Sequence, residues 1–224
     1  MREYVSGLFL IVDSRKYTDD IAFIGISPFE GQQTIISKGG NRENSRRGKA
    51  LDIGNALKAK LYKRHHYYLT EADIVESFSF LKSDLTTIVL FQILLAVLRH
   101  TYYLPERKFF FSVFQSLLEL DQSRDLERAE LGVFLIIMKI LNYYDILEFP
   151  LTCQVCHKNI YHGSFDYLGF SCDEHATNNT GTSFSLFTNE QRVAFLETIL
   201  RDLLGITITF NPELPFSSTK KHAH

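Results

Sequence analysis

The stretch Ala56-Leu-Lys-Ala-Lys-Leu-Tyr62 alternates apolar and basic residues. This is the pattern of a strand with one buried face and one face in water. The spacing of Lys58 and Lys60 puts both side chains on the same face. Other stretches of the first 75 or so residues are also rich in β-forming residues or alternate in this way: Val5–Val12, Ile21–Ile26, Gln33–Ser37 and Tyr67–Ile74.

Turn-forming clusters separate these stretches, at Asp13–Asp20, Pro28–Gly31 and Gly39–Gly48. Five short strands at nearly even spacing favour a small closed or partly open barrel over a sandwich. The OB-fold is the common five-stranded solution, so we expect residues 1–80 to form an OB-fold barrel.

Beyond residue 80 the sequence becomes helical. Ser83 can cap a helix that runs from Asp84 to about Tyr102. Pro105 suits the first turn of a second helix ending near Leu120, and a third helix is expected from Asp125 to about Tyr144. A closing helix at Val193–Leu204 follows Thr188 and Gln191, which have the spacing of a capping box. We therefore predict a multidomain α+β chain, with a helical domain at residues 81–210 and a loose tail at 211–224.

Charge divides the chain unequally. Residues 1–64 carry 12 Lys/Arg against 7 Asp/Glu, a net of +5, while the other 160 carry 12 against 19, a net of −7. A basic half of this kind is suited to phosphates, although a solvated basic face is the alternative. The apolar runs Leu85–Leu98 and Leu131–Leu141 are too short to span a bilayer. The N-terminus lacks a signal-peptide pattern, so we expect a cytoplasmic protein without a membrane partner.

The loop Lys38–Lys49 concentrates the basic charge. It holds three glycines and five cations in twelve residues: Lys38, Arg42, Arg46, Arg47 and Lys49. Glycines allow the backbone to approach a ligand closely, and the cations can contact phosphates. Lys58 and Lys60 extend the basic surface. Nearby aromatic residues could stack on bases or could simply pack, and they are Phe29, Tyr62, Tyr67 and Tyr68.

The three cysteines of the chain lie in two close pairs of candidate metal ligands. Cys153-Gln-Val-Cys156 is followed, after fifteen intervening residues, by Cys172-Asp-Glu-His175. Two such pairs can complete the tetrahedron that zinc takes at structural sites, and four protein ligands leave no position for a catalytic water. We predict one structural zinc ion in a module at about 150–176. His157 and His162 are alternatives to His175 as the fourth ligand.

No catalytic signature is found in the sequence. The chain has no Walker A loop, no zinc-deaminase pattern and no His-Glu-x-x-His helix. Asp19-Asp20 are interpreted as solvated acids of a turn, and His65-His66 as an exposed barrel edge rather than a ligand pair. We therefore expect a protein that is not an enzyme.

Four stretches together resemble the RecO family of bacterial DNA-repair and recombination-mediator proteins. They are the basic loop Ser37–Lys49, the segment Leu69–Phe78, the segment from Arg128 to Tyr144, and the metal pairs. The resemblance spans about residues 1–205, and it lies in the order and spacing of weak motifs. His175 stands where a fourth cysteine is usual in that family.

The resemblance implies an OB-fold joined to a zinc-bearing helical domain. It also implies binding to single- and double-stranded DNA, annealing of complementary strands, and a cytoplasmic, nucleoid-associated location in a bacterium. The implied partners are RecR and the single-stranded DNA-binding protein, with RecA loaded indirectly. Two alternatives remain at this stage. One is a zinc-stapled scaffold that binds an acidic protein, and the other is a zinc-dependent hydrolase in which water replaces His175.

A closed zinc site yields a first prediction. Cys153→Ser should lower the free energy of unfolding more than it lowers affinity for DNA, because metal binding at a closed site contributes folding energy. Denaturant unfolding and DNA titration of the same preparation provide the comparison. Absence of zinc from freshly purified protein in elemental analysis would rule out the metal site.

Overall fold

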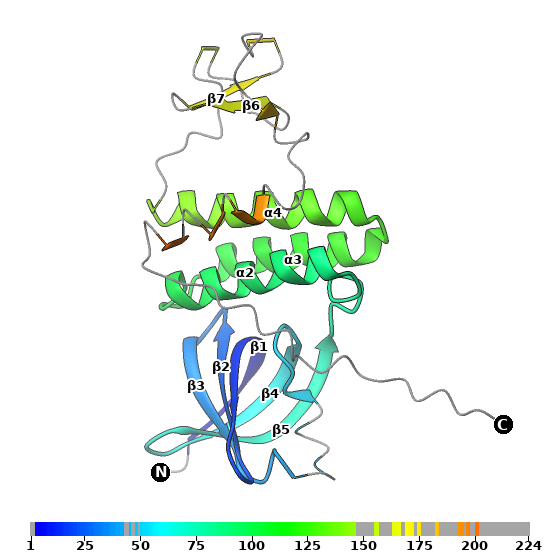
Figure 1. Cartoon of the computed structure of the whole chain (residues 1–224). Helices are drawn as coiled ribbons and strands as arrows, with labels where there is room; N and C mark the ends of the chain where they lie inside the picture. The colour runs from blue at the N-terminus through cyan, green and yellow to red at the C-terminus, as the bar shows by residue number, and fades with distance from the viewer. Residues whose placement is uncertain are drawn as a thin grey trace, which may run out of the picture.

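The computed structural model describes residues 3–42, 45, 48 and 50–146, and short pieces of the remainder at 155–156, 163–166, 169–172, 174–175, 182–183, 192–194, 196–197 and 200–201. An N-terminal five-stranded sheet is followed by three α-helices, which confirms the predicted α+β order (Figure 1). Among the described residues, no helix combines the length and apolar character needed to cross a membrane.

The strands are β1 (Glu3–Lys16), β2 (Ile21–Ser27), β3 (Gly31–Ser37), β4 (Ala56–Lys63) and β5 (Tyr67–Glu76). Each of them contains the range predicted for it. The alternation at the start of the sequence is confirmed, because Leu57, Ala59 and Leu61 are buried whereas Lys58 is exposed and Lys60 is half-buried. Local alternation was sufficient for β4 because most of its outer face is in water, whereas Phe9–Val12 of β1 are buried on both faces.

The sheet closes on itself in the strand order β1-β2-β3-β5-β4. β1 is long enough to pair with two neighbours, β4 along its first half and β2 along its second. A bulge between Ile11 and Asp13 interrupts the β1–β2 register, and bulges of this kind let a strand bend. β3 and β5 complete the closure through a parallel pairing, in which Ile35 lies opposite Tyr67.

Large apolar side chains fill the inside of the sheet, among them Phe9, Ile11, Phe23 and Ile35. Gly25 makes room for one of these rings. A Cβ at this position would lie 3.3 Å from Phe9. A small residue facing a large one is how a narrow barrel fits its interior.

The helices are α2 (Leu85–Thr101), α3 (Arg107–Ser123) and α4 (Leu126–Tyr143). The predicted Ser83 cap is wrong by one residue: Asp84 caps α2 and accepts from the Thr86 and Thr87 amides, whereas the Ser83 hydroxyl donates to the Phe80 carbonyl. α3 starts two residues after Pro105 and has no side-chain cap.

Asp125 caps α4, as its position at the start of the predicted helix suggested. The apolar interior of α4 is largely buried, including Val133, Phe134, Ile137 and Leu141. Residues of the predicted closing helix that are described are helical, and Leu196 and Leu200 are buried in the same core. Arg192 lies 4.0 Å from Glu130 of α4. Thr188, Gln191 and the tail at 211–224 lie outside the described residues.

A small three-stranded sheet follows the helices. It contains β6 (Gly163–Asp166), β7 (Gly169–Cys172) and β8 (Thr182–Ser183) in the order β7-β6-β8. β6 and β7 pair as an antiparallel hairpin. Figure 1 shows this sheet on the side of the helices that faces away from the five-stranded sheet.

One apolar core joins the five-stranded sheet to the helices. Leu10, Val12, Ile26 and Ala56 of the sheet belong to the same buried cluster as the helix residues. The boundary predicted near Phe78–Ser83 coincides with the change from strands to helices. It is a packed segment rather than an exposed linker, because Phe78 and Leu81 are fully buried.

Polar contacts reinforce this junction. The Tyr102 hydroxyl at the end of α2 donates to the Ser27 carbonyl at 3.0 Å. The backbone amide of Gln32 donates to the Tyr103 carbonyl at 3.2 Å. Gly31, with φ of +67°, permits this approach, since a Cβ there would lie 2.5 Å from the Tyr103 oxygen. On another side of the junction, the Arg99 guanidinium of α2 lies 2.7 Å from the Asp13 carboxylate of β1.

Lys82 adds a titratable group to the junction. Its ammonium donates to the Asn55 side-chain oxygen at 2.8 Å, and Asn55 is buried. Burial lowers the pKa of Lys82 from 10.5 to about 8, although Asp52, Asp121 and Glu76 act in the opposite direction. The charged form of Lys82 is therefore less favourable in the folded state than in the unfolded chain.

Stability should rise with pH because of Lys82. Between pH 8 and 10.5 the unfolded chain binds more protons at this lysine than the folded chain does, so its contribution to the free energy of unfolding increases through that window. The displacement of the pKa corresponds to roughly 3 kcal/mol.

Urea unfolding of the wild type and of Lys82→Met from pH 7 to 10.5 measures this effect, because the other titrating groups are common to both proteins. The wild-type free energy of unfolding should gain roughly 2–3 kcal/mol relative to the variant. Two parallel pH profiles would show that the lysine is not perturbed.

Candidate nucleic-acid interface

The first part of the basic loop leaves β3 and docks on the turn between β1 and β2. The Lys38 ammonium donates to the Asp20 carboxylate at 2.7 Å, and the Gly39 amide donates to its other oxygen at 2.8 Å. These hydrogen bonds, with that of Lys38 the larger, lower the pKa of Asp20. Gly39 has φ of +65°, a conformation that glycine adopts without strain.

Asp19 and Asn41 make the second contact between the loop and the turn. The backbone amide of Asn41 donates to the Asp19 carbonyl at 2.9 Å, and its side-chain amide donates to the Tyr17 carbonyl at 2.6 Å. The Arg42 guanidinium lies 3.3 Å from the Asp19 carboxylate, and both side chains are largely exposed.

Asp19 is exposed and Asp20 is half-buried, which agrees in part with their interpretation as solvated acids of a turn. Both are partners of the basic loop, and Asp20 holds it through two hydrogen bonds. These contacts depend on the β2–β3 pairing, which brings Ser37 opposite Ile21 and so places the loop beside the turn. Two of the predicted cations thus carry counter-charges from within the chain, which a bound phosphate would share or displace.

The glycines of the loop serve its own backbone. A Cβ on Gly48 would collide with the Gly40 carbonyl oxygen, so the loop folds back and two of its three glycines meet. The Ser45 hydroxyl accepts from the Gly48 amide at 3.1 Å within this fold. The loop glycines are predicted to let a ligand approach the backbone, whereas the contact between Gly40 and Gly48 is internal to the loop. Arg46, Arg47 and Lys49 lie outside the described residues.

Lys58 and Lys60 share the outer face of β4, as their spacing predicted. Lys60 forms an ion pair of 3.3 Å with Glu71 of β5, and Lys58 lies opposite Asp73 in the β4–β5 register. Exposed pairs of this kind add little stability and exchange readily with other ions. This face therefore carries cations whose partners are also in water.

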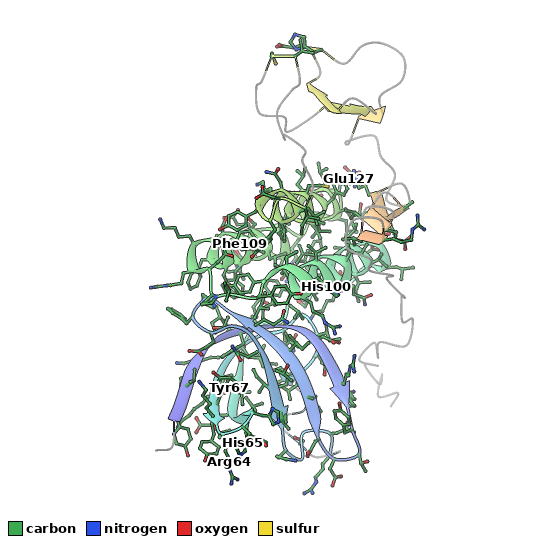
Figure 2. All side chains as sticks on the ribbon, turned by 90° about the vertical axis from the view of Figure 1, so that its left-hand side faces the viewer. Arg64, His65, Tyr67, His100, Phe109 and Glu127 are labelled. Atoms are coloured by element: carbon green, nitrogen blue, oxygen red, sulfur yellow. The ribbon has the colours of Figure 1, made fainter. Side chains whose placement is uncertain are left out.

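The turn between β4 and β5 adds Arg64, a cation that was not among the predicted site residues. Arg64, His65 and His66 are all exposed, which agrees with the expectation that the two histidines form an exposed edge. Figure 2 shows Arg64 and His65 at the end of the barrel that points away from the helices. Clustering of Lys and Arg in the sequence after Lys58 was the signal that could have included Arg64.

The predicted metal ligands are only partly described. Cys156 lies in a turn and packs partly against the main core, and Cys172 is the last residue of β7. His175 follows shortly in another turn. Cys153, His157 and His162 lie outside the described residues, as does the side chain of Cys172. The described side chains contain no group of three or more possible ligands, so they leave the four-ligand prediction open.

Comparisons with known proteins add no assignment to this geometry: no protein-family model matches the chain, and no curated protein matches it.

Proposed function

We propose that the chain is a nucleic-acid-binding protein that binds DNA at the end of the barrel away from its helices. The observation that carries this proposal is the gathering of basic segments around one closed sheet. Lys38 and Arg42 lie in the loop that follows β3. Lys58 and Lys60 lie on β4, and Arg64 lies in the next turn. Their spread suits a phosphate backbone better than a small anion.

The strand arrangement supports an OB-fold. Five strands close with β1 between β2 and β4, and with β3 parallel to β5. OB-folds bind oligonucleotides on the face of their second and third strands and at the loops that follow the first and fourth strands. The Asp19-Asp20 turn and the Arg64–His66 turn occupy those two positions in this chain. Both therefore border the surface on which we place DNA.

The more specific proposal is a recombination mediator resembling the RecO family. It is supported by the resemblance described above and by the order of a barrel followed by helices. In this proposal the protein anneals complementary strands and, with RecR, helps to load RecA onto DNA coated by the single-stranded DNA-binding protein. None of these steps requires the chain to be an enzyme.

A structural zinc ion belongs to the same proposal. Cys153, Cys156, Cys172 and His175 would hold it, and the ion would join two turns without supplying chemistry to a substrate. The place of Cys172 at the end of the β6–β7 hairpin fits this role, because a ligand pair at a hairpin end can close a zinc site with a pair from another turn.

Replacement of three loop arginines tests the DNA proposal. Arg42→Ala/Arg46→Ala/Arg47→Ala should weaken binding to unrelated DNA sequences by similar factors, because phosphates carry no sequence information. Loss of three phosphate contacts should reduce the slope of log K against log salt by roughly 2 for single strands. Fluorescence anisotropy with oligonucleotides at several salt concentrations measures both effects.

A matched control removes the same charge from the helical half. Lys108, Arg128 and Lys139 are exposed, so Lys108→Ala/Arg128→Ala/Lys139→Ala changes the net charge equally. This control should retain the wild-type salt slope. Equal losses in the two variants would point to net charge alone, and unchanged affinity in the loop variant would exclude the loop as the DNA contact. Absence of strand annealing by the wild type would exclude the mediator proposal.

A further inference from the structure

Three tyrosines lie side by side on the outer wall of the barrel. Tyr4 of β1 is the register partner of Tyr62 of β4, and Tyr62 is the partner of Tyr68 of β5. Residues directly opposite each other in paired strands point to the same face. Leu61 and Leu69, the neighbours of Tyr62 and Tyr68, are buried, so the tyrosines face outward. We name Tyr4, Tyr62 and Tyr68 the tyrosine row.

The rings of the row present aromatic surface to water. Tyr4 is 54% exposed, and Tyr62 and Tyr68 are half-buried. The Tyr4 and Tyr62 rings have centroids 5.4 Å apart and are tilted by 42°. A cross-strand aromatic pair adds only a modest free energy to a sheet. Sheet stability therefore does not account for the exposure of the Tyr4 ring.

Cations border the row on the same wall. The Lys60 ammonium lies 5.8 Å from the centroid of the Tyr4 ring. Lys60 is also two residues before Tyr62 on β4, so both point outward. At the other side of the row, Tyr68 is the parallel partner of Ile36, two residues before Lys38. The pKa of Lys38 is raised mainly by its hydrogen bond with Asp20 and, as the smallest of the raising causes, by Tyr68.

The row therefore lies between Lys60 of β4 and Lys38 at the end of β3. Adjacent strands lie ~4.8 Å apart, so the three tyrosines cover ~10 Å across the wall. That span is suited to about two unpaired bases. A duplex keeps its bases inside, so only its phosphates could reach the row.

We propose that the tyrosine row is a stacking platform for successive unpaired bases of single-stranded nucleic acid, with Lys38 and Lys60 holding the adjoining phosphates. This inference rests on the proposed nucleic-acid function and makes it more specific. Stacking tolerates any base, so the platform would distinguish single strands from duplexes without selecting a sequence. Such a preference is useful to a protein that must collect complementary single strands before they anneal.

The test compares two matched variants. Tyr4→Leu/Tyr62→Leu removes the aromatic faces and retains apolar side chains, whereas Tyr4→Phe/Tyr62→Phe retains the faces and removes only the hydroxyls. Three labelled probes of equal length are titrated: oligothymidylate, a single strand of abasic deoxyribose phosphates, and a duplex. Thermal unfolding of each variant shows whether it is folded.

The leucine variant should bind oligothymidylate about tenfold or more weakly than the wild type, and the phenylalanine variant should bind it normally. Neither variant should change affinity for the abasic strand or the duplex. Equal weakening for all three probes by the leucine variant, or unchanged affinity for oligothymidylate, would overturn the stacking platform. Failure of the wild type to bind any of the three probes would instead overturn the proposed function.

A measurement on the wild-type protein keeps the inference testable even where the leucine variant does not fold. Oligothymidylate containing 5-iodouracil is crosslinked by ultraviolet light, and the modified peptides are identified by mass spectrometry. Crosslinks should map to Tyr4, Tyr62 or Tyr68. Crosslinks confined to other aromatic residues would contradict the platform. Tyr67 is adjacent to Tyr68, so the crosslinked residue is assigned from fragment-ion spectra and not from peptide mass alone.

Discussion

The burial of Phe78 between the barrel and the helices is the interaction on which the architecture depends. Its side chain is fully buried, and its ring lies 5.8 Å from both Phe91 of α2 and Phe114 of α3. Phe78 has φ of 49°, which costs a non-glycine residue roughly 1–2 kcal/mol. Burial of a phenylalanine contributes roughly 2–3 kcal/mol, so packing outweighs the strain. The bend at Phe78 turns the chain from β5 toward α2.

Neighbouring contacts hold this bend in place. The buried Asp121 carboxylate of α3 accepts hydrogen bonds from the amides of Phe80 and Leu81, and the Lys82 amide donates to the Phe78 carbonyl. The helices are thereby fixed over one end of the barrel, as Figure 1 shows. That end is committed to packing, which leaves the wall and the opposite turns as the part of the barrel that can meet a large ligand.

Local periodicity in the sequence was enough to predict the strand ranges. Contacts between residues on different strands were not predicted, because they depend on the strand register. The strand ranges followed from alternation, and Lys58 and Lys60 followed from the same pattern. Asp20 could not be paired with Lys38, because their contact depends on how β2 aligns with β3. Tyr4 was missed for a similar reason, since nothing near it in the sequence reveals that Tyr62 lies opposite. Ser83 and Asp84 are both favourable N-cap residues, so residue preference alone could not choose between them. Asp84 is the cap in the structure, in which the chain bends at Phe78 before α2 begins.

The charge asymmetry of the sequence does not follow the division into barrel and helices. Residues 1–64 carry a net charge of +5 and the remainder −7, and the helices lie at the opposite end of the barrel from Arg64 and His65. β4 alone has eight residues, which extend over ~26 Å. That length is several times the screening distance of ~8 Å at physiological salt. The three helices carry five Lys/Arg against four Asp/Glu, so they contribute little to the potential at the basic end. Part of the acidic charge lies instead on β5 of the barrel, at Glu71, Asp73 and Glu76. Any attraction of a polyanion to the barrel therefore depends on the local cations of the basic loop, β4 and the Arg64 turn, and not on a charged helical half.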